Sequence, residues 1–359
     1  MNKPLISIIA TFHNNEKTAK RLIKSVFSQS YTNWELICID DCSPQNDYEI
    51  INKFRCERML AIRNQHNLGA NPSRKIGIDY ARGEYITFID GDDWLEKDAI
   101  KKMVDTALKH NTDLVLMNSY RRYPLGFKKK LNNYTTKFNN PILYNDIINN
   151  YYISFFGVNL INVAYWGKLI RTDIVRRSKF EYNNLSIGED LLFNAYYFPM
   201  LKSMVFIDYY GYNWRFGGFT SSNKTIEQNR KIILNFIELY RIKSSLADKF
   251  NFQKAYKPMA IELKNVLLSN ISTIAKYAED NSKSRPIKEL ISEIISNDDF
   301  YHSISYLLSN ERYSNDLFIK AIYEKNITTI YNICHSNYRS NWKKRIIKNI
   351  LHKIQNKII

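Results

Sequence analysis

Hydrophobic positions in the first 120 residues follow two alternating periods. Short apolar runs are typical of buried strands, and the segments between them carry apolar residues at the spacing of one helix face. The expected strands are 5–10, 34–39, 59–62, 85–89 and 113–117. The expected helices are 16–28, 48–54, 72–81 and 96–110. This alternation predicts an α/β fold with a mostly parallel sheet that is flanked by helices.

Beyond residue 118 the pattern of polar and apolar positions changes twice. Residues 118–150 are polar and include three consecutive lysines, so we expect an excursion from the sheet, such as a flap. Residues 151–222 are mixed and rich in aromatic side chains. From Thr225 onward apolar residues recur at helical spacing, which predicts a separate helical region. The expected domains are 1–222, with halves 1–118 and 119–222, a helical domain 223–338 and a terminal helix 339–359.

The last segment has an amphipathic pattern of its own. Apolar residues recur at helical spacing over Trp342–Ile359, lysines and one arginine fill other positions, and no acid appears. A basic amphipathic helix suits an anionic membrane surface, so we expect residues 340–359 to bind one. The alternative is a terminal helix that packs on the protein or on a partner subunit.

Composition narrows the choice of partners and compartment. The formal net charge of +17 indicates an anionic partner, which could be nucleic acid, anionic lipid or a phosphorylated substrate. The four cysteines lack metal-ligand spacing, which favours a reducing cytoplasm. The apolar run after Pro4 is too short for a signal peptide or a membrane span. We therefore expect a cytoplasmic protein that is soluble or peripheral at the inner face of the membrane.

Three polar clusters fall where expected strands end. They are Thr11–Asn14, Asp40-Asp41 and Asp90–Asp93. Ligands of parallel sheets bind outside the carboxyl ends of the strands, so these clusters should converge on one crevice. The last cluster places three carboxylates in four residues, and their repulsion is relieved by a hard divalent cation with phosphate ligands. The alternative for this cluster is a solvated acidic turn.

Several sequence motifs follow one another in a fixed order along residues 4–222. They are the first strand and its loop at 6–14, a helix end at 25–31, an acidic second strand at 35–43, a stretch at 67–84, and Gly188-Glu189-Asp190. In this order they resemble the family 2 glycosyltransferases, which have the Rossmann-like GT-A fold. His13 stands where that family usually has Tyr, and Cys42 replaces a common Gly.

The resemblance implies a binding site for a nucleotide-sugar donor. It implies that Thr11, His13 and Asp41 hold the base, and a carboxylate that accepts the imide N–H of uracil favours UDP. It also implies that Arg74 reaches the nucleotide or its diphosphate. The acids Asp90, Asp92 and Asp93 would hold Mn²⁺ or Mg²⁺ on the diphosphate, with Asp92 and Asp93 the stronger candidates for the metal.

The resemblance also implies roles on the acceptor side. Asp190, beside Glu189, would be the general base of an inverting transfer; the alternative is that these acids cap the helix they open. Trp166 would stack on a sugar ring of the acceptor or simply pack in the core. Arg215, in a late loop that continues to Gly217-Gly218, would bind phosphate.

The leading hypothesis is therefore an inverting, metal-dependent glycosyltransferase that uses a UDP-sugar. Its acceptor would be a glycan or a lipid-linked hydroxyl in bacterial surface polysaccharide synthesis, such as capsule, lipooligosaccharide or O-antigen. A basic nucleic-acid-binding protein is the alternative, although no known nucleic-acid motif appears. A nucleotidyltransferase is disfavoured because Thr11–Lys17 contains no glycine. The helical region from Thr225 could serve acceptor binding or dimerisation, so a homo-oligomer is possible.

Overall fold

The computed structural model describes residues 3–44, 46–131, 141–180, 185, 187–216, 225–275 and 281–340. The chain divides into two compact units. The first comprises Met1–Tyr152, Leu160–Asn184 and Glu189–Gly218, and the second comprises Ile153–Asn159, Leu185–Gly188 and Phe219–Ile359. The expected terminal helix over Trp342–Ile359 lies outside the described residues.

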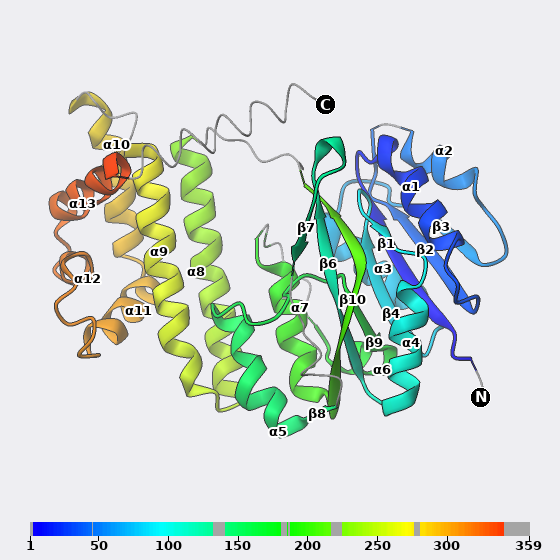
Figure 1. Ribbon diagram of the computed structural model, residues 1–359. Helices are drawn as coiled ribbons and strands as arrows, with labels where there is room; N and C mark the ends of the chain where they lie inside the picture. The colour runs from blue at the N-terminus through cyan, green and yellow to red at the C-terminus, as the bar shows by residue number, and fades with distance from the viewer. Residues whose placement is uncertain are drawn as a thin grey trace. The chain divides into compact units, whose positions relative to one another are not determined.

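Four parallel strands form the first half of the sheet in unit 1. They are β1 (Ile6–Phe12), β2 (Trp34–Asp40), β3 (Met59–Arg63) and β4 (Tyr85–Asp90), in the order β3-β2-β1-β4 (Figure 1). Each strand except β3 is buried along most of its length. All four were expected from the sequence, with bounds that differ by at most two residues at an end.

The second half of the sheet mixes strand directions. After β4 the order continues β9-β6-β10-β5, with β9 (Lys168–Arg171) antiparallel to both of its neighbours. The long strands β6 (Leu114–Arg122) and β10 (Ser203–Arg215) run parallel to each other. The short strands are β5 (Trp94–Leu95), β7 (Lys128–Leu131), which pairs with β6, and β8 (Ile142–Leu143), which pairs with β10.

Strand β10 was not expected from the sequence. Its pairing with β6 shifts register between Ile207 and Tyr210 and again between Tyr210 and Tyr212. Such irregularities break the period of two that identifies a strand in sequence. Strand β6 runs to Arg122 and is therefore longer than the expected 113–117, because its end pairs with β7 and β10.

Helices cover both faces of the sheet in unit 1. The face of β1 that carries Ile6 and Ile8 packs in one core with α1 (Glu16–Phe27) and α4 (Ala99–His110). On the other face lies α3 (Ala70–Tyr80), where a Cβ on Gly77 would stand 2.5 Å from Ile9 Cγ2, so only glycine permits this approach. The remaining helices and short helical segments of unit 1 are α2 (Asp47–Asn52), η1 (Pro124–Gly126), α5 (Tyr144–Asp146), η3 (Ile147–Tyr151), α6 (Thr172–Arg177), α7 (Glu189–Tyr197) and η5 (Phe198–Met200).

The helices expected in the first 120 residues are confirmed, with one shifted start. Helix α4 begins at Ala99 rather than at Glu96. The Glu96 N–H bonds the Gly211 carbonyl at 2.9 Å, so this residue continues the β5–β10 pairing instead of opening the helix. The sequence pattern could not show this, because the partner residue lies more than a hundred positions away.

The second unit is helical from Thr225 onward, as expected. Thr225 and Gln228 form a capping box that starts α8. The helical elements are α8 (Ile226–Lys249), η6 (Gln253–Ala255), α9 (Tyr256–Ala275), α10 (Asn281–Ile295), α11 (Asp298–Leu308), α12 (Leu317–Tyr323) and α13 (Ile327–Ser340), and η4 (Tyr152–Phe156) joins the two units in sequence. Among the residues that the structure describes, no helix is both long and apolar enough to cross a bilayer.

Candidate active site

The three polar clusters meet at the carboxyl ends of the parallel strands. Thr11 at the end of β1 is in register with Asp90 of β4, and Phe12 is in register with Asp40 of β2. The turn after β4 closes tightly, with the Asp93 N–H donating to the Asp90 carbonyl at 2.9 Å. A Cβ at Gly91 would lie 2.4 Å from Asn15 Oδ1, so the turn and the first-strand loop touch directly.

The carboxylate of Asp41 braces the loop that leads into α3. Its Oδ1 accepts hydrogen bonds from Asn64 Nδ2 and the Leu68 N–H, each at 2.8 Å. Its Oδ2 accepts the Gly69 N–H, also at 2.8 Å. Because a carboxylate oxygen accepts about two hydrogen bonds, Oδ2 retains one acceptor position. Asp41 thus has a structural duty, with one acceptor position left for a ligand.

The imidazole of His13 is exposed but held in place. Its Nδ1 lies 2.9 Å from the Asp41 carbonyl, and because a carbonyl only accepts, Nδ1 carries the proton. The other ring nitrogen then accepts from Asn67 Nδ2 at 3.1 Å. A flat ring is therefore fixed beside the Asp41 loop. The side chain of Thr11 stands one strand position before Phe12 and is half-buried.

The acids after β4 have three different environments. Asp93 is fully buried, and its oxygens accept the Tyr212 hydroxyl at 2.6 Å and the Arg215 N–H at 2.7 Å. Desolvation, with the charges of Asp90 and Asp92, raises the pKa of Asp93 well above its usual value. Asp90 Oδ1 accepts from Arg74 at 2.8 Å. Asp93 therefore anchors the end of β10, and Asp90 anchors Arg74.

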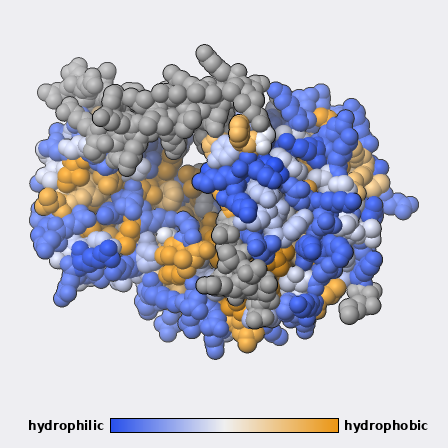
Figure 2. All heavy atoms as spheres, in the orientation of Figure 1, coloured by the Kyte–Doolittle hydropathy of each residue, from blue (hydrophilic) through white to orange (hydrophobic). Residues whose placement is uncertain are grey.

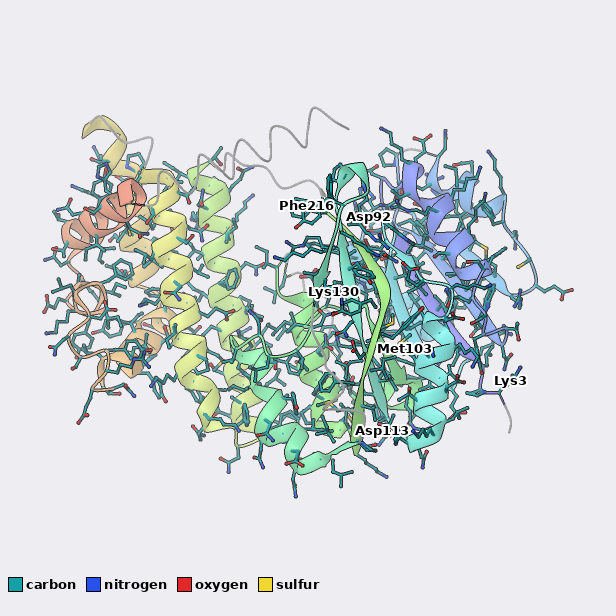
Figure 3. The ribbon with its side chains drawn as sticks, viewed as in Figure 1. Lys3, Asp92, Met103, Asp113, Lys130 and Phe216 are labelled. Carbon is teal, nitrogen blue, oxygen red and sulfur yellow. The ribbon has the colours of Figure 1, made fainter. Side chains whose placement is uncertain are left out.

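Asp92 has a partly exposed carboxylate with a long ion pair. Its side chain is 27% exposed, and its ion pair to Arg215 Nη1 is long, at 3.9 Å. Desolvation and the charge of Asp90 raise the pKa of Asp92. Figure 3 labels Asp92 at the same end of the sheet as Phe216, the residue that follows β10.

These residues suit a divalent cation that is held mainly by the donor's phosphates. Among the described residues, no three His, Cys, Asp or Glu side chains are grouped as a metal site. Mg²⁺ is commonly bound by one or two carboxylates together with substrate phosphates. The half-exposed carboxylate of Asp92 fits that role, whereas both oxygens of Asp93 already accept hydrogen bonds.

Arg74 joins the acid of β4 to the acid of α7. Its guanidinium donates to Asp90 at 2.8 Å and to Asp190 Oδ1 at 3.2 Å, and it lies 4.2 Å from the Tyr165 ring centroid. Desolvation lowers the pKa of Arg74, but the two carboxylates outweigh it and raise that pKa. Arg74 thus holds Asp190 next to the end of β4, a role that differs from the direct nucleotide contact implied by the resemblance.

Asp190 combines partial exposure with a strongly shifted pKa. Its side chain is 29% exposed, and it lies in the first turn of α7 after Gly188, whose φ is +90°. Desolvation raises the pKa of Asp190 to about 7, with Arg74 opposing the shift. Desolvation also raises the pKa of the neighbouring Glu189. A carboxyl that titrates near neutral pH is suited to general-base chemistry, whereas a solvated helix cap would keep an ordinary pKa.

Lys168 is a buried cation that the sequence did not single out. It is fully buried in β9, its Nζ donates to the Ala164 carbonyl, and desolvation lowers its pKa to about 7 while the charge of Asp190 opposes that shift. The sequence signal was a lysine followed directly by Leu169-Ile170 in an apolar run. Tyr165 and Tyr212 were also not singled out, although both contact residues of the site.

The two remaining candidates lie near β10. Trp166 is buried and stacks on Tyr212, with ring centroids 4.5 Å apart and planes 6° apart. This placement favours packing over sugar stacking for Trp166. Arg215 points one guanidinium nitrogen toward Asp92 while its N–H holds Asp93. Gly217 and Gly218 lie outside the described residues.

The sheet of unit 1, with acids at the ends of its strands, has the GT-A fold. Residues 7–176 match the sequence model described as Glycosyl transferase family 2. The resemblance to family 2 that the motifs indicated is therefore confirmed over these residues.

Individual proteins support the same assignment. The chain is 28% identical to a cholesterol galactosyltransferase of Borreliella burgdorferi over 66% of this chain and 68% of that protein. It is 23% identical to the glycosyltransferase GlyA of Streptococcus pneumoniae, over 99% of this chain but only 51% of GlyA. The crystal structure of S. aureus TarS 1–349 with UDP-GlcNAc has the same fold, with a TM-score of 0.66, 16% identity, and coverage of 94% of this chain and 92% of the TarS 1–349 chain.

Proposed function

We propose that this protein transfers a sugar from a UDP-sugar to a hydroxyl of a glycan or lipid-linked acceptor, with inversion, in the synthesis of a bacterial surface glycan. The observation that carries the proposal is Asp190, a carboxyl with a pKa of about 7 that Arg74 holds beside Asp90. A relative named for a sterol acceptor supports a lipid as the acceptor.

Asp190 acts as the general base in this proposal. Its carboxylate accepts the proton of the acceptor hydroxyl while that oxygen forms a bond to the anomeric carbon of the donor. The bond from the anomeric carbon to the β-phosphate oxygen breaks, and its electron pair leaves with UDP. The charge of Arg74 favours the ionised form of Asp190, and the ion pair between them orients the Asp190 carboxylate. General bases of this kind contribute roughly 10²–10⁴ in rate.

The donor lies along the carboxyl ends of β1, β2 and β4 in this proposal. The fixed ring of His13 offers a surface for the uracil, and the remaining acceptor position of Asp41 suits its imide N–H. Asp92 and Arg215 face the diphosphate. When bound, Mn²⁺ or Mg²⁺ would neutralise charge on the departing UDP.

The test is turnover by the purified full chain. UDP release is measured with UDP-glucose, UDP-galactose and UDP-GlcNAc in the presence of Mn²⁺, after thermal-shift screening identifies the donor that stabilises the protein. Asp190→Asn should lower kcat about 100-fold or more while the donor still stabilises the protein. Asp173→Asn is the matched control, because Asp173 is exposed and pairs with Arg177 one helical turn away. Wild-type turnover by Asp190→Asn would contradict the assignment of the base.

We also propose that the protein works at the cytoplasmic face of the membrane. The expected membrane contact through residues 340–359 stays a prediction. It is tested by liposome binding that weakens with salt and is lost when those residues are deleted. The possible homo-oligomer likewise stays a prediction, which light scattering of the purified chain would settle.

A further inference from the structure

The hairpin of β6 and β7 has an apolar tip between two basic strands. Its connection is the short helical segment Pro124–Gly126, and the Tyr123 N–H closes it by donating to the Phe127 carbonyl at 2.8 Å. Phe127 is 69% exposed. Gly126 has a φ of +81°, and a Cβ there would meet nothing within 4 Å, so the tip faces open space.

Cations flank this tip on both strands. Residues 121–131 contain two arginines and three lysines and no acid. Lys128, Lys129 and Lys130 are all exposed on β7. They stand opposite Arg122, Arg121 and Tyr120 in the antiparallel register. Figure 2 shows a strongly hydrophilic area over β7.

Two of the three lysines lie over aromatic rings. Lys128 Nζ lies 4.4 Å from the Tyr120 ring centroid, and Lys130 Nζ lies 4.7 Å from that of Tyr210. Those two rings stack on each other at 4.8 Å. Rings covered by lysine are not offered for stacking on bases, so the surface is unlike a platform for single-stranded nucleic acid.

We propose that the β6–β7 hairpin is a membrane-docking element whose apolar tip enters the interface of an anionic bilayer. An exposed aromatic side chain prefers the headgroup boundary, and lysines around it attract anionic lipid phosphates. The long lysine stems let the ammonium groups reach the headgroups while the tip stays deeper. The charge and the apolar tip complement a lipid surface together, whereas a soluble phosphate would engage only the charge.

The hairpin also lies next to the candidate active site within unit 1. Arg122 of β6 is in register with Arg215 of β10, whose N–H donates to Asp93. A bilayer at the hairpin would therefore bring lipid headgroups to the edge of the sheet where Asp92 lies. This last consequence rests on the proposed function, but the docking surface itself does not.

The test reads the environment of the tip directly. Cys42 and Cys56, which are not buried, are replaced by serine, while Cys38 and Cys334 are buried. An environment-sensitive NBD fluorophore is then attached to Phe127→Cys in the full chain. The matched control carries the probe at Tyr80→Cys on α3, another exposed aromatic position at 55%. Both proteins are mixed with phosphatidylcholine vesicles that contain phosphatidylglycerol, with pure phosphatidylcholine vesicles, and with inorganic phosphate.

The expected result is a blue shift at position 127, together with quenching by lipids that carry a doxyl group, with the anionic vesicles only. Position 80 should show neither effect. Because the probe reports its own position, binding by another segment cannot produce this result. Equal responses at 127 and 80, no response at 127, or the same response to inorganic phosphate alone would each overturn the proposal.

Removal of the lysine charges gives an independent measurement of vesicle binding. Lys128→Gln/Lys129→Gln/Lys130→Gln should weaken binding to anionic vesicles about tenfold or more, and added salt should mimic that loss. The control Lys17→Gln/Lys20→Gln/Lys24→Gln removes the same charge from exposed positions of α1. Equal weakening by both triple variants would show a general charge effect and would contradict a docking role for the hairpin.

Discussion

Two acids at the ends of β2 and β4, the strands on either side of β1, differ in how their carboxylates are hydrogen-bonded. Asp41, after β2, accepts three hydrogen bonds from fixed N–H groups of Asn64, Leu68 and Gly69. Asp92, after β4, faces Arg215 only at 3.9 Å, and desolvation and the charge of Asp90 raise its pKa. The protein itself holds the carboxylate of Asp41, with one acceptor position left over, whereas the carboxylate of Asp92 would be stabilised by a bound cation.

This difference suggests that Asp41 serves the stability of the fold and that Asp92 serves its function. A hydrogen-bonded carboxylate stabilises the folded chain, and removing it leaves buried donors unpaired. A crowded carboxylate is a cost to the folded chain that a bound cation and diphosphate can offset. The same chemical change, Asp to Asn, should therefore have opposite consequences at the two positions.

The largest effect is expected at Asp92. Asp92→Asn should lower kcat about 100-fold or more, because it removes the negative charge that is proposed to hold the cation. The same substitution should leave the melting temperature of the free protein unchanged or higher, because it removes repulsion with Asp90. Turnover and thermal unfolding are measured with and without Mn²⁺ and donor. Asp105→Asn is the control, since that acid forms an exposed pair with Lys101. A lowered melting temperature with retained turnover would mean that Asp92, like Asp41, serves stability rather than function.

The next effect is expected at Asp41. Asp41→Asn replaces an acceptor by an amide N–H₂ that faces the Gly69 or Leu68 N–H, and a buried unsatisfied donor costs about 1–3 kcal/mol. Urea unfolding should show this loss without a change in the slope of the transition. Unchanged stability would mean that the loop before α3 is not braced by this carboxylate.

The sequence predicted the acids at the strand ends better than it predicted the residues that pair with them. The acids were found because each follows an apolar run of parallel strand, and the strand ends were placed within two residues. The partners of those acids could not be found in the same way. Tyr212 and Arg215 lie on β10, whose register shifts hide its period, and the burial of Lys168 near the charge of Asp190 depends on the fold.

A pH-dependent effect links Asp190 to Lys168. The folded pKa of Asp190 is about 7, above its usual value of 3.8, so its contribution to stability is complete at low pH and is lost as pH rises through 7. The folded pKa of Lys168 is also about 7 but lies below its usual 10.5, so its contribution is complete at high pH and is lost as pH falls through 7.

The two contributions are separated by variants. Asp190→Asn should remove a fall in unfolding free energy between pH 4 and 7 of roughly 2 kcal/mol, and Lys168→Met should remove a rise of similar size between pH 7 and 10. Urea unfolding across pH measures both. Turnover should rise with pH through 7 as Asp190 ionises. Parallel stability curves for the variants and the wild type would show that neither group titrates as described.

The smallest effect is expected at Cys42, next to Asp41. Its φ is +54°, a region in which a side chain is strained and glycine is not. Cys42→Gly should raise the unfolding free energy by about 0.5 kcal/mol. The relief of backbone strain stabilises the folded chain, and the greater conformational entropy of glycine in the unfolded chain offsets part of that gain. Cys56→Gly, at an exposed cysteine outside the residues with positive φ, should lower the unfolding free energy instead. The strained residue Cys42 lies next to Asp41 and not next to the acids that follow β4. Cys42→Gly should therefore leave turnover unchanged. A change in kcat would show that the loop held by Asp41 also affects the reaction, which would contradict the difference between Asp41 and Asp92.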